Sequence, residues 1–139
     1  MFKYEVKYTD YNGVDRAETL YFNLNKPETA KLSASMEGGL AEYIKKIYKN
    51  KDTKEILKIF DDIIKMSYGV KSDDGLHFVK SDDIYEEFKT SEAYSEFYYE
   101  LATNEELAAA FINGIMPKGF MAEASPEEMD KARAELGLN

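Results

Sequence analysis

The first residues of the chain alternate strictly between apolar and polar side chains. Phe2, Tyr4, Val6 and Tyr8 alternate with Lys3, Glu5, Lys7 and Thr9. A period of two puts the two sets on opposite faces of an extended chain, so residues 2–9 predict a half-buried strand. Residues 15–24 repeat the pattern with Leu20, Phe22 and Leu24 on one face. The chain is therefore expected to begin with two strands.

The connection between these strands carries an Asn-Gly turn signal. A two-residue turn would place the apolar face of the second strand beside charged residues of the first. A three-residue loop ending at Gly13 instead pairs Tyr4 with Leu20. The same register pairs Phe2 with Phe22. Because a slip of one residue moves every side chain to the other face, we predict the longer loop, with Gly13 left-handed in a bulge.

Beyond residue 25 the apolar residues change to helical spacing. One apolar run, Leu40 to Tyr48, follows a break at Gly38-Gly39. A residue able to cap a helix precedes each of the other runs, in order Asn25, Asp52, Ser81, Thr90 or Ser91, and Thr103. Gly69 is a natural helix stop, and residues 70–80 predict a turn-rich connection or a small hairpin. We predict an α+β fold in which the N-terminal antiparallel hairpin packs on a bundle of about five helices.

The chain changes character after residue 117. Residues 1–117 are predicted to form a single α+β domain, and residues 118–139 a mobile linker with a short, loosely attached C-terminal helix. Ser125-Pro126-Glu127-Glu128 is a helix start, but few apolar residues follow it, namely Met129, Ala132 and Leu136. Because so short a helix is marginal alone, we expect it to be mobile or ordered only by a partner.

Residues able to carry catalysis or hold a metal are scarce. The chain has no Cys and one His, His77, which we expect to be a loop or edge residue. Asp73-Asp74-Gly75 does not fit a calcium loop, because Val70 and Ser81 would occupy positions that need Asp and Glu. Neighbouring carboxylates diverge on a helix, and no phosphate-binding loop or nucleophile elbow is present. We predict no enzyme, cofactor or metal site.

Charge and hydropathy narrow the choice of partners. No signal-peptide run and no membrane-length apolar segment is present, so we expect a cytoplasmic protein with no membrane partner. The formal net charge of -9 disfavours nucleic acid as a partner. The acidity serves solubility or, alternatively, DNA mimicry, although interleaved lysines dilute any acidic stripe.

Apolar side chains gather where the compact domain is expected to end. They are Phe111, Ile112, Ile115 and Met116, with Phe120 and Met121 just beyond. These residues either pack onto the core of the domain or form a partner-binding surface, a role that suits adaptable Met side chains. Tyr99 lies off the apolar face of its helix and is a further candidate for partner binding.

Five groups of residues together resemble tail assembly chaperones of long-tailed phages and prophages of low-GC Gram-positive bacteria. They are Phe2-Lys3-Tyr4-Glu5-Val6 with Tyr21-Phe22-Asn23-Leu24; Glu37-Gly38-Gly39-Leu40 with Glu42-Tyr43-Ile44; Ser67-Tyr68-Gly69 with Lys71-Ser72-Asp73-Asp74-Gly75; Tyr94-Ser95-Glu96 with Glu100-Leu101; and Phe111-Ile112-Asn113-Gly114-Ile115. The resemblance runs from about residue 2 to 117. None of these segments is a catalytic signature.

The resemblance implies a chaperone that coats the tape measure protein and keeps it soluble while tail tube protein polymerises around it. Such proteins are absent from the finished virion, are expected to self-associate, and often exist in two forms, the longer made by ribosomal frameshifting. Tape measure protein, tail tube protein and further copies of the chain are thus the expected partners. The alternative is a small acidic phage protein that inhibits a host DNA-binding protein by DNA mimicry.

Overall fold

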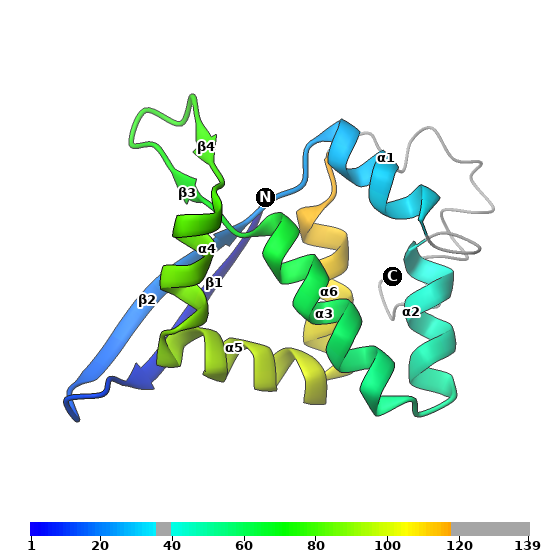
Figure 1. The fold of residues 1–139 in the computed structure, drawn as a ribbon, viewed down its shortest axis with the longest axis horizontal. Coiled ribbons are helices and arrows are strands. Elements are labelled where there is room, and N and C mark those ends of the chain that lie inside the picture. The colour runs from blue at the N-terminus through cyan, green and yellow to red at the C-terminus, as the bar shows by residue number, and fades with distance from the viewer. Residues whose placement is uncertain (36–39, 118–139) are drawn as a thin grey trace.

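The computed structural model describes residues 1–35 and 40–117, in which an antiparallel hairpin packs against helices (Figure 1). The elements in order are β1 (Phe2–Thr9), β2 (Asp15–Phe22), α1 (Lys26–Ala34), α2 (Leu40–Lys49), α3 (Thr53–Ser67), β3 (Val70–Lys71), β4 (Phe78–Val79), α4 (Asp82–Lys89), α5 (Glu92–Thr103) and α6 (Glu105–Ile115). The predicted α+β architecture is confirmed, with six helices in the described part. The predicted linker and C-terminal helix, residues 118–139, lie outside the described residues.

The hairpin has the predicted register. β1 and β2 pair antiparallel, with Tyr4 opposite Leu20 and Phe2 opposite Phe22. Gly13 has a φ of 80°, as the three-residue loop requires. The apolar residues of both strands therefore share one face, and that face packs on the helices.

Phe22 is the centre of the core. Its ring centroid lies 4.8 Å from Phe97 of α5, 5.3 Å from Phe111 of α6, 6.2 Å from Phe88 of α4 and 6.3 Å from Phe2 of β1. Rings at these separations add to the stabilisation that comes from burying their area. One fully buried side chain of the hairpin thus joins three helices.

Most of the predicted helix caps are confirmed. The side chains of Asn25, Asp52, Ser81 and Ser91 each accept a hydrogen bond from a backbone N–H of the helix that follows. The cap predicted at Thr103 is wrong. That residue ends α5, where its hydroxyl donates to the Tyr99 carbonyl at 2.8 Å, and the neighbouring Asn104 caps α6.

The small hairpin is present as β3 and β4, which pair antiparallel. Gly69, predicted as a helix stop, follows α3 after one further residue. A Cβ atom at Gly69 would lie 2.7 Å from Cε2 of Phe78 and 2.8 Å from the carbonyl oxygen of Val79. The position therefore needs glycine because β4 passes directly against it. None of the helices in residues 1–35 and 40–117 has the length and apolar character needed to cross a membrane.

Candidate partner-binding groove

Helices α1, α2 and α3 border a groove of about 420 Å³. One face of α3 forms its longest side, through Glu55, Lys58, Ile59, Asp62, Lys65 and Met66. These positions recur every three or four residues, so a single helix presents them together. Leu32 and Ser35 contribute from α1 and its C-terminal end, and Tyr43 from α2. Both shorter helices lie to the same side of α3 (Figure 1).

The groove has an apolar base and a charged rim. Leu32 and Ile59 are buried at its base, and Met66 packs against the core beside them. The acids Glu55 and Asp62 alternate along α3 with Lys58 and Lys65, which are exposed. Apolar surface bordered by charges is the arrangement that an amphipathic helix requires of its binding site.

A hydrogen bond ties α2 to α3 at one end of the groove. The Tyr43 hydroxyl donates to Oε2 of Glu55 at 2.9 Å. The same bond raises the pKa of Tyr43, because only the protonated phenol can donate to the carboxylate, and burial adds to the effect. This hydrogen bond therefore fixes α2 against α3 at this end of the groove.

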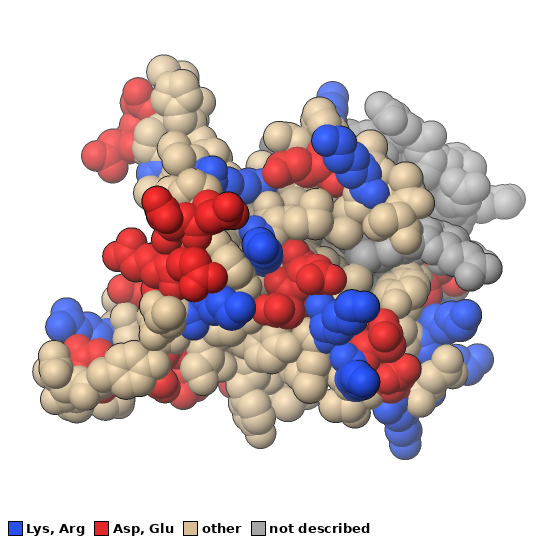
Figure 2. All heavy atoms as spheres, in the orientation of Figure 1, with Lys and Arg blue, Asp and Glu red and all other residues tan. Residues whose placement is uncertain are grey.

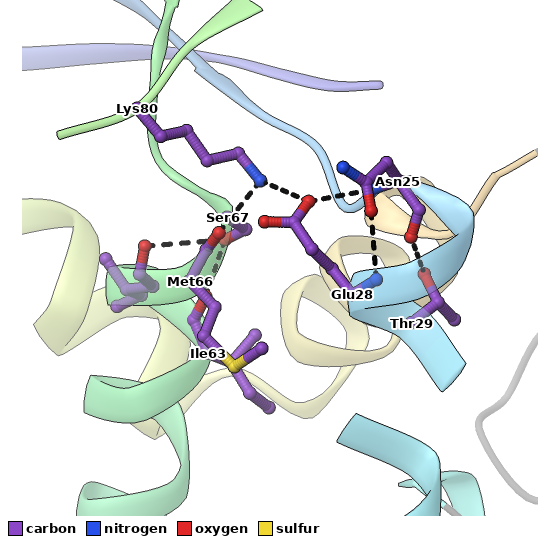
Figure 3. A network of polar contacts seen from close by, with 8 residues as sticks. Asn25, Glu28, Thr29, Ile63, Met66, Ser67 and Lys80 are labelled. Atoms are coloured by element: carbon purple, nitrogen blue, oxygen red, sulfur yellow. Dashed lines mark hydrogen bonds and ion pairs between the residues drawn. The ribbon is translucent and has the colours of Figure 1, made fainter. Parts of the chain in front are cut away.

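A polar network ties α1 to the other end of α3 (Figure 3). Lys80 Nζ donates to Oε1 of Glu28 at 2.7 Å and to the carbonyl oxygen of Met66 at 2.9 Å. Glu28 also accepts from the backbone N–H of Asn25, completing the capping box of α1. Lys80 therefore joins the first turn of α1 to the last turn of α3, and the groove is held at both ends.

Asp61 anchors α3 away from the groove. Its Oδ1 accepts from the hydroxyl of Tyr94 on α5 at 2.5 Å and from the hydroxyl of Tyr85 on α4 at 3.2 Å. Burial, followed by the hydrogen bond to Asp61, raises the pKa of Tyr94 well above its ordinary value. We interpret these bonds as structural ties between α3 and the two following helices.

The described residues do not form a metal-binding cluster. Within the ranges 1–35 and 40–117, no three side chains among His, Asp and Glu are placed to hold a metal ion. His77 lies exposed in the loop between β3 and β4, as a loop residue should.

The structure separates the partner-binding residues that the sequence suggested. Phe111, Ile112 and Ile115 are fully buried in the core, so they present no surface in this conformation. Met116 packs partly buried against that core, whereas Tyr99 on α5 is 69% exposed. The remaining two candidates, Phe120 and Met121, lie outside the described residues. None of the candidates in the described part lines the groove.

Sequence reasoning missed the groove. The charged positions of α3 look like an ordinary solvated face, and nothing local indicates that α1 and α2 border them. Lys58 and Lys65 lie two turns apart with Asp62 between them, a spacing that an ordinary solvated face shows as well.

Acids and lysines are interspersed over the face shown in Figure 2. The largest acidic group there belongs to α4, which begins with Asp82 and Asp83. Two lysine amines lie close to a ring of this helix. Nζ of Lys65 is 5.9 Å and Nζ of Lys89 is 5.8 Å from the centre of the ring of Tyr85, which belongs to α4. On this face the acidic groups therefore do not form a continuous negative stripe of the kind that imitates DNA.

A family model described as phage tail assembly chaperone matches residues 1–136. The match includes every helix and strand described above and extends to the end of the helix predicted from the sequence at residues 125–136. No curated protein and no solved structure matches the chain.

Proposed function

Since the chain belongs to the phage tail assembly chaperone family, we propose that it binds the tape measure protein and keeps that protein soluble during tail morphogenesis. The family is one of assembly proteins and is not catalytic. We further propose that the chain acts in the cytoplasm of the bacterial host and is absent from the mature virion.

The groove between α1, α2 and α3 is the proposed client site. Its α3 side runs from Glu55 to Met66, which corresponds to about three helical turns and roughly 17 Å. A client helix with an apolar stripe would lay that stripe on Leu32, Ile59 and Met66 and its polar sides against the charged rim. The observation that supports this function best is the combination of the family match with a groove of this shape.

Coating a long client does not require tight single contacts. Many weak sites along one tape measure protein act through effective concentration. Once one site is bound, the neighbouring sites are held at a high local concentration and bind more readily. Self-association of the chain and contact with the tail tube protein fit this proposal. Exposed Tyr99, on a different helix from the groove, is a candidate for one of these further contacts.

Co-expression with the cognate tape measure protein tests the proposal. The wild-type chain should raise the soluble fraction of the client and co-purify with it. The variant Lys58→Glu/Lys65→Glu should lose both effects, because it reverses the lysine rim of the groove. The control Lys31→Glu/Lys54→Glu makes the same charge change at exposed positions that do not line the groove, and it should behave as wild type. A client that neither co-purifies nor gains solubility with the wild-type chain would rule the function out.

The DNA-mimic alternative rests on the net charge of -9 alone. It predicts that the chain competes with DNA for a host protein and that the competition weakens steeply with added salt. The lysines interspersed among the acids do not favour it (Figure 2).

A further inference from the structure

The chain leaves the described domain beside a wall of the groove. The backbone N–H of Leu24, just before α1, donates to the carbonyl of Ile115 at the end of α6 at 2.8 Å. The neighbouring N–H of Asn23 donates to the carbonyl of Ser67, the last residue of α3, also at 2.8 Å. The described chain therefore ends, at residue 117, close to the start of α1 and to the C-terminal end of α3.

The groove is within reach of the segment that follows. Residues 118–124, seven in number, span up to about 25 Å when extended. A helix with its side chains is about 10–12 Å across, so this length suffices to pass around α1. The next twelve residues, 125–136, are as many as the α3 side of the groove presents between Glu55 and Met66.

The sequence of that segment matches the groove in polarity. Met129, Ala132 and Leu136 are spaced to form one apolar stripe on a helix, and they are preceded by a strong helix start. Such a stripe suits the base formed by Leu32 and Ile59. The family match ends at Leu136, the last residue of the stripe, so the segment belongs to the family unit.

The charges match as well. Lys58 and Lys65 are seven residues apart on α3, and neither forms an ion pair with a carboxylate of residues 1–35 or 40–117. Glu128 and Glu135 are also seven residues apart, so on a helix they project from one side at the same two-turn spacing. Because the segment begins near the C-terminal end of α3, it would run antiparallel to α3. Glu128 would then face Lys65, and Glu135 would face Lys58.

We propose that residues 125–136 dock as an amphipathic helix in the groove of their own chain, so that each copy carries an internal occupant of the client site. The docking follows from the match of length, polarity and charge; its consequence for the client rests on the function proposed above. A tethered occupant covers the apolar base between encounters with the tape measure protein. The client must displace this occupant. The competition favours a client that carries many binding segments over an isolated short helix.

Docking is measured directly in the full chain, which has no Cys of its own. A spin label on Ser35→Cys, at the groove, should strongly broaden the methyl signals of Met129 and Leu136 in a methyl-labelled sample. The same label on Asn12→Cys, at the far tip of the hairpin, is the control and should leave both signals sharp. Sharp signals with the Ser35 label would overturn the proposal.

Charge reversal tests the pairing. Lys58→Glu/Lys65→Glu and Glu128→Lys/Glu135→Lys should each weaken the broadening, and the combination of all four should restore it. No restoration would overturn the proposed pairs.

A mixed sample, with the spin label and the methyl label on different molecules, distinguishes a second copy as the occupant. Broadening that persists undiminished in the mixture would replace docking within one chain by docking between chains.

A peptide in trans measures the occupancy. A synthetic peptide of residues 122–139 should bind the full-length variant Met129→Asp/Leu136→Asp at least about tenfold more tightly than it binds wild type, because the tethered segment no longer competes. Equal affinities would overturn the proposal. None of these experiments contains the client, so docking can be confirmed while the client-binding function fails, and the two results remain separate.

Discussion

A Cβ atom added to Gly114 would lie 2.8 Å from Cδ1 of Phe2. Helix α6 therefore meets strand β1 without room for a methyl group. The Phe2 ring in turn packs edge-on against Phe111, one helical turn earlier, with ring centroids 5.4 Å apart. The first and last described elements of the domain are thus joined by close packing.

Gly114→Ala should destabilise the domain. In an unconstrained helix this substitution stabilises by about 1 kcal/mol, but here the new methyl group displaces the Phe2 ring from a packed site. We expect a net loss of about 1–2 kcal/mol in the free energy of unfolding, measured by urea denaturation. The control Asn113→Ala, at an exposed position of the same helix, should cause no loss. An increase in stability for Gly114→Ala would contradict the close contact.

Lys80→Met should loosen α1 from α3. It removes the donor to Glu28 and to the Met66 carbonyl while keeping most of the side-chain volume. Because Lys80 and Glu28 are partly exposed, the loss of global stability should be small, about 1 kcal/mol or less. Backbone amides in the first turn of α1 should exchange hydrogen faster, whereas those of α5 should not change. Unchanged exchange in α1 would show that this network does not hold the helix.

Stability should fall at alkaline pH. Burial, with a smaller effect from Glu105, raises the pKa of Tyr48 from 10 to about 12, and the pKa of Tyr94 is also raised. Above pH 10 the unfolded chain releases these protons while the folded chain keeps them, so stability present below pH 10 is lost as the pH rises toward 12. Each such proton contributes a slope of at most about 1.4 kcal/mol per pH unit. Tyr48→Phe should reduce the slope, measured by urea denaturation from pH 9 to 11.5; an unaltered slope would contradict the assignment.

Tyr99 and Phe111 should respond differently to truncation. Tyr99→Ser, at a ring that is 69% exposed, should change the free energy of unfolding by no more than about 0.5 kcal/mol. Phe111→Ala empties a fully buried site and should cost about 3–5 kcal/mol. Loss of client binding in a well-folded Tyr99→Ser protein would make Tyr99 a contact residue. The same loss in Phe111→Ala would only reflect the damaged core, which circular dichroism would reveal.

The parts of the fold that depend on neighbouring residues were predictable from the sequence. The hairpin register follows from matching Phe2 and Tyr4 to Phe22 and Leu20, and most caps follow from one polar side chain before an apolar run. Thr103 misled because its hydroxyl bonds back into α5, leaving the capping role to the next residue. That choice depends on where the preceding helix ends, which the local pattern does not define.

The groove depends on contacts between distant residues, so the sequence did not reveal it. Leu32, Tyr43 and Ile59 meet only after α1 and α2 have packed beside α3. The burial of three of the candidate partner-binding residues has a related cause. Phe111 packs against Phe2 and Phe22, more than eighty residues earlier, so only the folded chain shows which of the two predicted roles its ring has in this conformation.

The position of Phe22 also determines when the core can be completed during synthesis of the chain. The ribosome makes Phe22 early, but two of the rings that enclose it, Phe97 and Phe111, are added some seventy-five and ninety residues later. At about 5–20 residues per second, several seconds pass before these two rings can cover the apolar face of the hairpin. A nascent chain therefore has no completed core until α6 has left the exit tunnel, and a truncated product lacking α6 should be removed by the quality-control proteases of the cell.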